Sequence, residues 1–91
     1  GKPREPEKSL KITIPEDLQY DGVFDDVLGR YTAESELVEV RTTNMGSLFQ
    51  LEYAIRLKEP GHEKQMIDEL RCLNGNLKIS CGRPAVGRET L

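Results

Sequence analysis

The sequence contains no tryptophan, one histidine and two cysteines among its 91 residues. Two cysteines are too few for a disulfide scaffold, and Cys72 and Cys81 lack the C-x-x-C spacing of a zinc or redox motif. We therefore expect two free thiols and a reducing compartment. The histidine, His62, has no sequence neighbour that completes a metal or catalytic pair, so neither a metal nor a cofactor is expected.

The chain also lacks a strong net charge and a long apolar run. A formal net charge of −3 provides no basic surface for nucleic acid or for an anionic membrane. There is no signal peptide and no apolar segment of membrane-spanning length. With 36% hydrophobic and 32% charged residues, the chain should fold as one small domain with two layers.

The clearest pattern that is present is an alternation of apolar and polar residues between positions 37 and 58. Five apolar residues at every second position predict a buried central strand: Phe49, Leu51, Tyr53, Ile55 and Leu57. A shorter alternation over residues 38–42, with Glu39 and Arg41 between apolar neighbours, is typical of an edge strand. Asn44 and Gly46 tolerate positive φ and predict the turn between the two strands.

Helical spacing occurs on both sides of this hairpin. The first apolar stripe consists of Phe24, Val27, Leu28 and Tyr31. Asp21 is its expected N-cap, Asp25 and Asp26 complement the positive helix end, and residues 32–36 should end the helix. The second stripe, in a helix over residues 62–73, consists of Met66, Ile67, Leu70 and Leu73. Gly75 is its expected left-handed C-terminal residue.

Two further strands complete the order. Residues 10–14 alternate until Pro15, which cannot extend a ladder, and Leu77, Ile79 and Cys81 form the last alternation. The order β-α-β-β-α-β predicts an α+β, ferredoxin-like split sandwich, in which a four-stranded antiparallel sheet carries both helices on one face. The open face should be lined by Lys11, Thr13, Arg41, Gln50, Glu52, Arg56 and Lys78. Residues 1–9 are predicted to be a linker, 10–83 the domain and 84–91 a flexible tail.

Two functions common on such a sheet are disfavoured by the residues. RNA-recognition modules stack bases on aromatic residues of the open face, whereas Phe49 and Tyr53 are in phase with the core. Acylphosphatase-like enzymes bind phosphate after the first strand through a G-x-V-Q-G-V-x-F-R pattern. Asp25 stands here where a guanidinium is needed, and its carboxylate would repel phosphate. We therefore expect no enzyme, and rank an acylphosphatase-like hydrolase third among the hypotheses.

The loop over residues 17–22 is the best candidate for a ligand site. In ACT-type regulatory domains, a similar entry into the first helix presents backbone N–H groups to a small effector. Pro15, Glu16, Asp17 and Gly22 match that entry loosely, and a connecting loop with an N-cap is the favoured interpretation of them. The candidate ligand or interface residues are Asp17, Asp21, Gly22, Asn44, Gly46 and Arg71.

Three segments resemble a known family. They are residues 14–26 (IPEDLQYDGVFDD), residues 42–49 (TTNMGSLF) and residues 68–77 (DELRCLNGNL). They look like the C-terminal part of a domain-of-unknown-function family of small bacterial multi-pass membrane proteins, often found near VTC-type polyphosphate polymerases. The layout is also similar to the ACT-like domain that ends MgtC-type membrane proteins. This resemblance covers residues 10–83 and carries no assigned functional residues.

The resemblance implies a domain on the cytoplasmic side of the cell membrane, following the last transmembrane helix of a longer chain. Our first hypothesis is a non-enzymatic regulatory or assembly domain that acts through protein contacts. An ACT-like small-molecule sensor is the alternative. The edge strand, residues 38–42, is the predicted surface for a protein partner or for self-association, since Val38 and Val40 favour strand pairing and Glu39 and Arg41 alternate in sign. Charges on an open edge more often prevent association, so a protective role is the alternative for Glu39 and Arg41.

Overall fold

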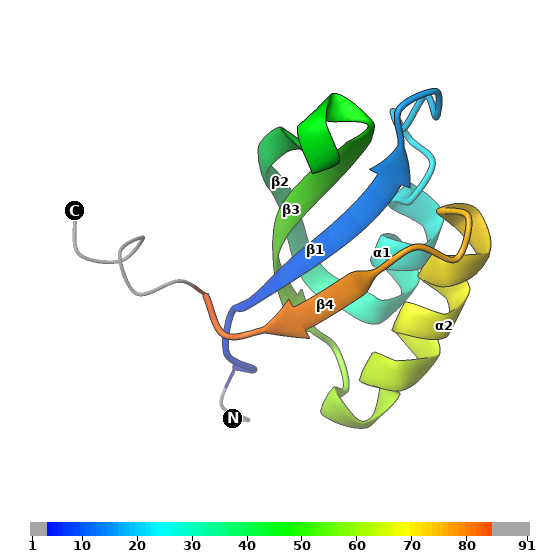
Figure 1. Cartoon of the computed structure of the whole chain (residues 1–91). Coiled ribbons are helices and arrows are strands. Elements are labelled where there is room, and N and C mark those ends of the chain that lie inside the picture. The colour runs from blue at the N-terminus through cyan, green and yellow to red at the C-terminus, as the bar shows by residue number, and fades with distance from the viewer. Residues whose placement is uncertain (1–3, 85–91) are drawn as a thin grey trace.

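The structure, a computed structural model, describes residues 4–84 as an α+β domain (Figure 1). Its strands are β1 (Lys8–Pro15), β2 (Thr32–Thr43), β3 (Leu48–Leu57) and β4 (Ile79–Gly82). The α-helices are α1 (Asp25–Tyr31) and α2 (Glu63–Leu73), and two short 3-10 turns are η1 (Asn44–Gly46) and η2 (Pro60–His62). Among the described residues, no helix has the length and apolar character that crossing a membrane would require.

The four strands form one antiparallel sheet in the order β2-β3-β1-β4. β1 and β3 are therefore the central strands, as predicted, while β2 and β4 are the edges. Both helices lie on the same side of this sheet (Figure 1). The arrangement is compatible with the predicted ferredoxin-like layout. The shortest extent of the molecule is 19 Å, as expected for one sheet and one helix layer.

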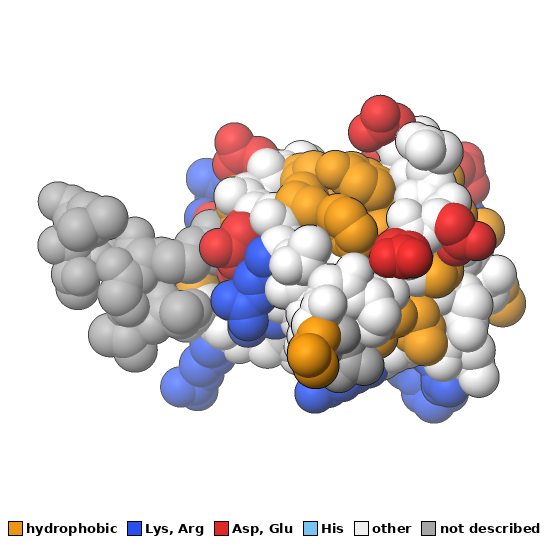
Figure 2. All heavy atoms as spheres, turned by 45° about the horizontal axis from the view of Figure 1, so that its top comes forward, with side chains coloured by type: hydrophobic (Ala, Val, Ile, Leu, Met, Phe, Trp, Pro, Cys, Tyr) orange, Lys and Arg blue, Asp and Glu red, His pale blue; other side chains and the backbone are white. Residues whose placement is uncertain are grey.

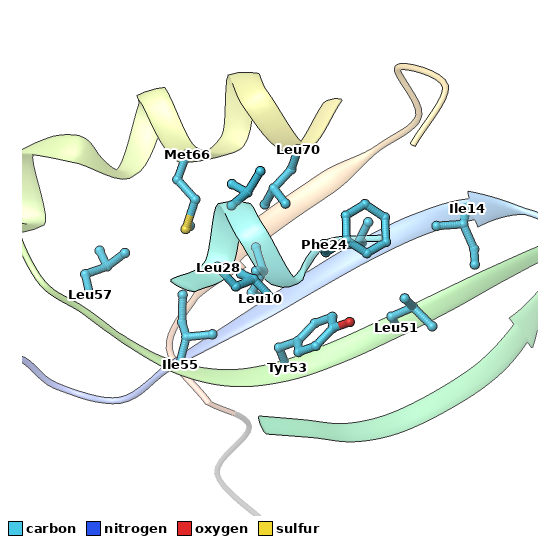
Figure 3. Close-up of a cluster of buried hydrophobic side chains, with 12 residues drawn as sticks. Leu10, Ile14, Phe24, Leu28, Leu51, Tyr53, Ile55, Leu57, Met66 and Leu70 are labelled. Carbon is cyan, nitrogen blue, oxygen red and sulfur yellow. The ribbon is translucent and has the colours of Figure 1, made fainter. Parts of the chain in front are cut away.

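The core lies between the helices and the two central strands (Figure 3). The alternation predicted for β3 is confirmed, because Leu51, Tyr53, Ile55 and Leu57 are buried on the helix side, and Phe49 is half-buried there. β1 supplies Leu10, Ile12 and Ile14, and the helices supply Phe24, Val27, Leu28, Met66 and Leu70. Apolar burial of this kind is the main source of the domain's stability.

Three boundaries differ from the prediction. β1 begins at Lys8, inside the predicted linker, and β4 begins at Ile79 rather than Leu77. The predicted loop over residues 32–36 is wrong, because β2 starts at Thr32 directly after α1. That first half of β2 has polar side chains and no alternation, so periodicity could not identify it. The predicted tail lies outside the described residues except for Pro84.

The predicted N-cap is also wrong. Phe24 occupies the N-cap position of α1 without a side-chain cap, and Asp21 lies in the preceding turn. Asp25 and Asp26 do occupy the first turn, where carboxylates complement the helix dipole.

In α2, Met66 and Leu70 are fully buried and Ile67 is half-buried, which confirms the predicted phase, while Leu73 at the helix end is exposed. Gly75 has the expected positive φ of 75°.

The predicted open face holds with two differences. Lys78 precedes β4 and so lies outside the sheet. Thr13 is on that side of β1 but is buried, as is Ser9, because small side chains on a central strand are covered by longer neighbours. The cysteines follow the prediction, since both thiols are free, Cys72 is exposed and Cys81 packs against the core.

Candidate functional site

The loop between β1 and α1 is built from two successive turns. The Leu18 N–H donates to the Pro15 carbonyl and the Val23 N–H donates to the Tyr20 carbonyl, each at 3.1 Å. Gly22 is the third residue of the second turn and has φ of 78°, a conformation that a side chain would strain. The candidate residues Asp17 and Asp21 are exposed on this loop.

The amide groups at the helix entrance are used within the loop. The Asp25 N–H donates to the Gly22 carbonyl at 3.4 Å, and α1 itself has 7 residues. The side chains around this entrance are carboxylates, those of Asp21, Asp25 and Asp26. An anionic effector would therefore meet negative charge, and the Val23 and Asp25 amides already donate within the loop.

The hairpin turn between β2 and β3 contains the candidates Asn44 and Gly46. Positive φ occurs at Met45 (59°) and at Gly46 (91°). Met45 has two features that are uncommon for a large apolar residue. Its side chain is fully exposed, and its backbone lies in the left-handed region.

The candidate Arg71 is exposed in the last turn of α2. It lines an open depression of about 450 Å³ together with Asp68, Cys72, Gly75 and Asn76. The Asn76 N–H donates to the Arg71 carbonyl at 3.0 Å and closes the turn that follows the helix. All five lining residues come from α2 and this turn, so the depression includes none of the other candidates.

The predicted candidates lie at one end of the molecule but on separate loops. Pro15 pairs with Leu48, which places the β1–α1 loop beside the hairpin turn. The Asn74 Nδ2 donates to the Thr13 carbonyl at 2.7 Å, and the Thr13 N–H donates to the Lys78 carbonyl, so the α2–β4 connection is at this end too. The fold thus brings all six candidates to one end of the molecule: Asp17, Asp21, Gly22, Asn44, Gly46 and Arg71. Of these six, Arg71 alone lines the depression beside it.

The most exposed regular element is β2, whose residues 33–43 all lie at the surface. Within the described residues, no strand pairs with its outer side. Leu37 is 41% exposed, and Val38 and Val40 are each 38% exposed. We refer to residues 33–43 as the β2 edge. Figure 2 shows that hydrophobic side chains reach the surface on the face in view, with acidic side chains on either side of them.

A β-bulge at Val38 divides the β2 edge. The pairing with β3 shifts between Leu37 and Glu39, so Val38 has no direct partner. Cross-strand partners share a face of the sheet, hence Leu37, opposite Tyr53, and Val40, opposite Leu51, both lie on the helix side. The extra residue shifts the phase of the alternation, so Leu37 and Val40, three positions apart, share one face of the sheet.

The open-face side of the β2 edge is charged. Glu39 lies opposite Glu52, and Arg41 lies opposite Gln50, with Arg41 Nη1 4.0 Å from Glu39 Oε1. Further along the strand, Glu34 forms ion pairs with Arg56, at 3.5 Å, and with Arg4. The β2 edge therefore carries apolar side chains on one face and charges of both signs on the other.

Two side-chain networks have no counterpart in the sequence reasoning, because their members are far apart in the chain. Lys8 of β1 pairs with Glu63 at the start of α2, beside Cys81 of β4. The hydrogen bond from Lys8 lowers the pKa of the Glu63 carboxyl and raises that of Lys8. Burial, followed by hydrogen bonding with Glu63, raises the pKa of Cys81 to about 12.

The second network joins the two helices. Arg30 of α1 and the Tyr31 hydroxyl both donate to the Glu69 carboxylate of α2. Hydrogen bonding to Arg30, and then to Tyr31, lowers the pKa of Glu69. Both networks fasten helices to neighbouring elements, and neither lies at the β2 edge.

Within residues 4–84, no group of three or more His, Cys, Asp or Glu side chains is arranged to hold a metal ion. His62 is exposed in η2. In comparisons with known proteins, no family model, no curated protein and no solved structure matches this chain.

Proposed function

We propose that this chain is a non-enzymatic contact domain that regulates or assembles a larger protein by binding protein along the β2 edge. The observation that carries the proposal is the exposure of residues 33–43 on an edge strand, which carries three large apolar side chains at the surface and whose outer side pairs with no other described strand. An unpaired edge offers a row of backbone N–H and C=O groups to another chain, and exposed apolar side chains add contact area.

The fold belongs to the same proposal. We propose a ferredoxin-like split sandwich, supported by the order β2-β3-β1-β4 with β1 and β3 in the centre. We also propose that the domain belongs to a membrane-embedded parent and lies at its cytoplasmic side. The support for this part is the resemblance of residues 14–26, 42–49 and 68–77 to the membrane-protein family. Hydrophobic spans upstream of these residues in the gene would be the expected finding, and a soluble enzyme there would contradict it.

A photo-crosslinking amino acid tests the contact surface. Placed at Glu36, on the β2 edge, it should give a covalent adduct with a polypeptide in cells that express the parent protein. The matched control is the same amino acid at Gln65, an exposed position on α2, which should give none. Adducts of equal yield at both positions, or at neither, would contradict the proposal.

The small-molecule sensor hypothesis predicts a different result when the domain is unfolded in the presence of candidate ligands. Thermal unfolding with amino acids, nucleotides or polyphosphate should leave the melting temperature unchanged if the domain acts by protein contact. A concentration-dependent rise that is lost in Asp17→Ala or Asp21→Ala would favour a small-molecule sensor instead. Hydrolysis of an acyl phosphate that is lost in Arg71→Ala would favour the acylphosphatase-like alternative.

A further inference from the structure

We propose that the partner at the β2 edge is a second copy of this chain. The two β2 strands pair antiparallel about a two-fold axis that passes between the two Val40 residues. This inference rests on the proposed contact function and names its partner. In the pair, Glu39 of each copy lies opposite Arg41 of the other, and the two Val40 side chains meet.

The backbone of this part of β2 is free and regular. Residues 39–43 pair with residues 48–52 of β3 without interruption, from Glu39↔Glu52 to Thr43↔Leu48. The bulge at Val38 ends this regular stretch on one side and η1 ends it on the other. A second strand centred on Val40 can therefore form a short regular ladder with the outer side of residues 39–41, which the bulge ends on one side.

The charges of this stretch complement themselves under two-fold symmetry. Antiparallel pairing about Val40 places residue 39 opposite residue 41 twice, and Glu39 and Arg41 already share the open face. Within one chain, the cross-strand neighbour of Glu39 is another carboxylate, Glu52. A guanidinium from a second copy would place a further opposite charge beside Glu39, and cross-strand pairs of opposite charge stabilise a sheet.

The apolar side supports the same register. Val40 is 38% exposed on the helix side, so its meeting with the other Val40 removes apolar surface of both copies from water.

Charge exchange provides the test, with oligomeric state measured by sedimentation equilibrium from micromolar to millimolar concentration. Wild type should dimerise. Glu39→Arg alone places two guanidinium groups opposite each other, and Arg41→Glu alone places two carboxylates opposite each other. Each single variant should therefore dimerise about tenfold or more weakly than wild type. An equimolar mixture of the two should form a heterodimer, and the double variant should again dimerise with itself.

Two controls keep the result specific. Glu16→Arg changes the net charge as Glu39→Arg does, but at an exposed loop position, and should dimerise like wild type. Val40→Pro removes an N–H from the proposed ladder and should be a monomer, with circular dichroism confirming that it is folded, because an edge strand tolerates proline. A wild type that stays monomeric, or a dimer that is indifferent to these exchanges, would overturn the inference. Crosslinks from Glu36 to a different polypeptide alongside a monomeric wild type would leave the contact function standing and refute the second copy as partner.

Discussion

At the scale of single residues, Asn74 connects the end of α2 to the centre of the sheet. Its side chain is fully buried, and its Nδ2 donates to the carbonyls of Thr13, at 2.7 Å, and Leu77, at 3.3 Å. These bonds explain why β4 begins only at Ile79, since Leu77 is occupied in the connection. The sequence suggested a tight reversal here, but not that the asparagine side chain reaches a strand 61 positions away.

Asn74→Ala should destabilise the domain by about 1–3 kcal/mol, because it removes the donor to the buried Thr13 carbonyl and to the partly buried Leu77 carbonyl. The measurement is the free energy of unfolding in urea. Gln65→Ala, at an exposed position of α2, is the control and should change it by less than about 0.5 kcal/mol. If both variants cost the same, the side-chain bridge contributes nothing.

The Cys81 thiol should be unreactive in the folded protein. Its pKa is raised from 9.0 to about 12, mainly by burial. In Cys72→Ser, which retains Cys81 alone, alkylation at neutral pH should be about a hundredfold slower in the folded protein than in urea. Cys81→Ser retains the exposed Cys72 and should show little difference between the two states. Rapid alkylation of folded Cys72→Ser would contradict the placement of Cys81.

At the scale of elements, the periodic ones were predictable, whereas the exposed strand β2 was predictable only over residues 38–42. β3 and α2 each place one side in the core, so hydrophobic periodicity marks them directly. β2 is exposed along residues 33–43, so burial imposes no alternation on it, and the bulge at Val38 shifts the phase of what alternation there is. Because of this exposure, hydrophobic periodicity did not identify the first half of β2. The same exposure makes β2 the candidate contact surface.

The phase of α2 can be tested directly. Leu70→Ala should destabilise by about 2–5 kcal/mol, because Leu70 is fully buried and its truncation leaves a cavity. Cys72→Ser, two residues further on the exposed side, should stay within about 0.5 kcal/mol. Urea unfolding of both variants provides the comparison, and equal losses would mean that the helix is rotated from its described position.

At the scale of the whole molecule, Lys8 and Glu63 link β1 to α2 near the end opposite the hairpin turn. The folded state lowers the pKa of Glu63 from 4.5, chiefly through the hydrogen bond from Lys8. A carboxyl with a lowered pKa stabilises the fold at pH above its unfolded value, and that stabilisation is lost as the pH falls through the folded pKa.

Wild type should therefore be more stable than Glu63→Gln above pH 4.5, and the difference between them should shrink below it. Unfolding in urea across the acid range measures this difference. Glu16→Gln, which changes an exposed carboxyl in the β1–α1 loop, is the control. A gap between wild type and Glu63→Gln that is constant with pH would refute the ion pair's role.

The predicted candidate residues were brought to one end of the molecule, whereas the β2 edge runs along its side. Their grouping follows from the topology, which the sequence could predict. The partners within each network, such as Lys8 and Glu63, could not be predicted, because no local pattern marks a contact between residues 55 positions apart.

The shortness of β4 determines how far copies of this sheet could add to one another. β4 pairs with β1 over 4 residues, so the edge opposite β2 offers little ladder to a further strand. A sheet with two long open edges can polymerise into a fibre. With a single long open edge, joining two copies covers the long edge of each, so assembly stops at a dimer.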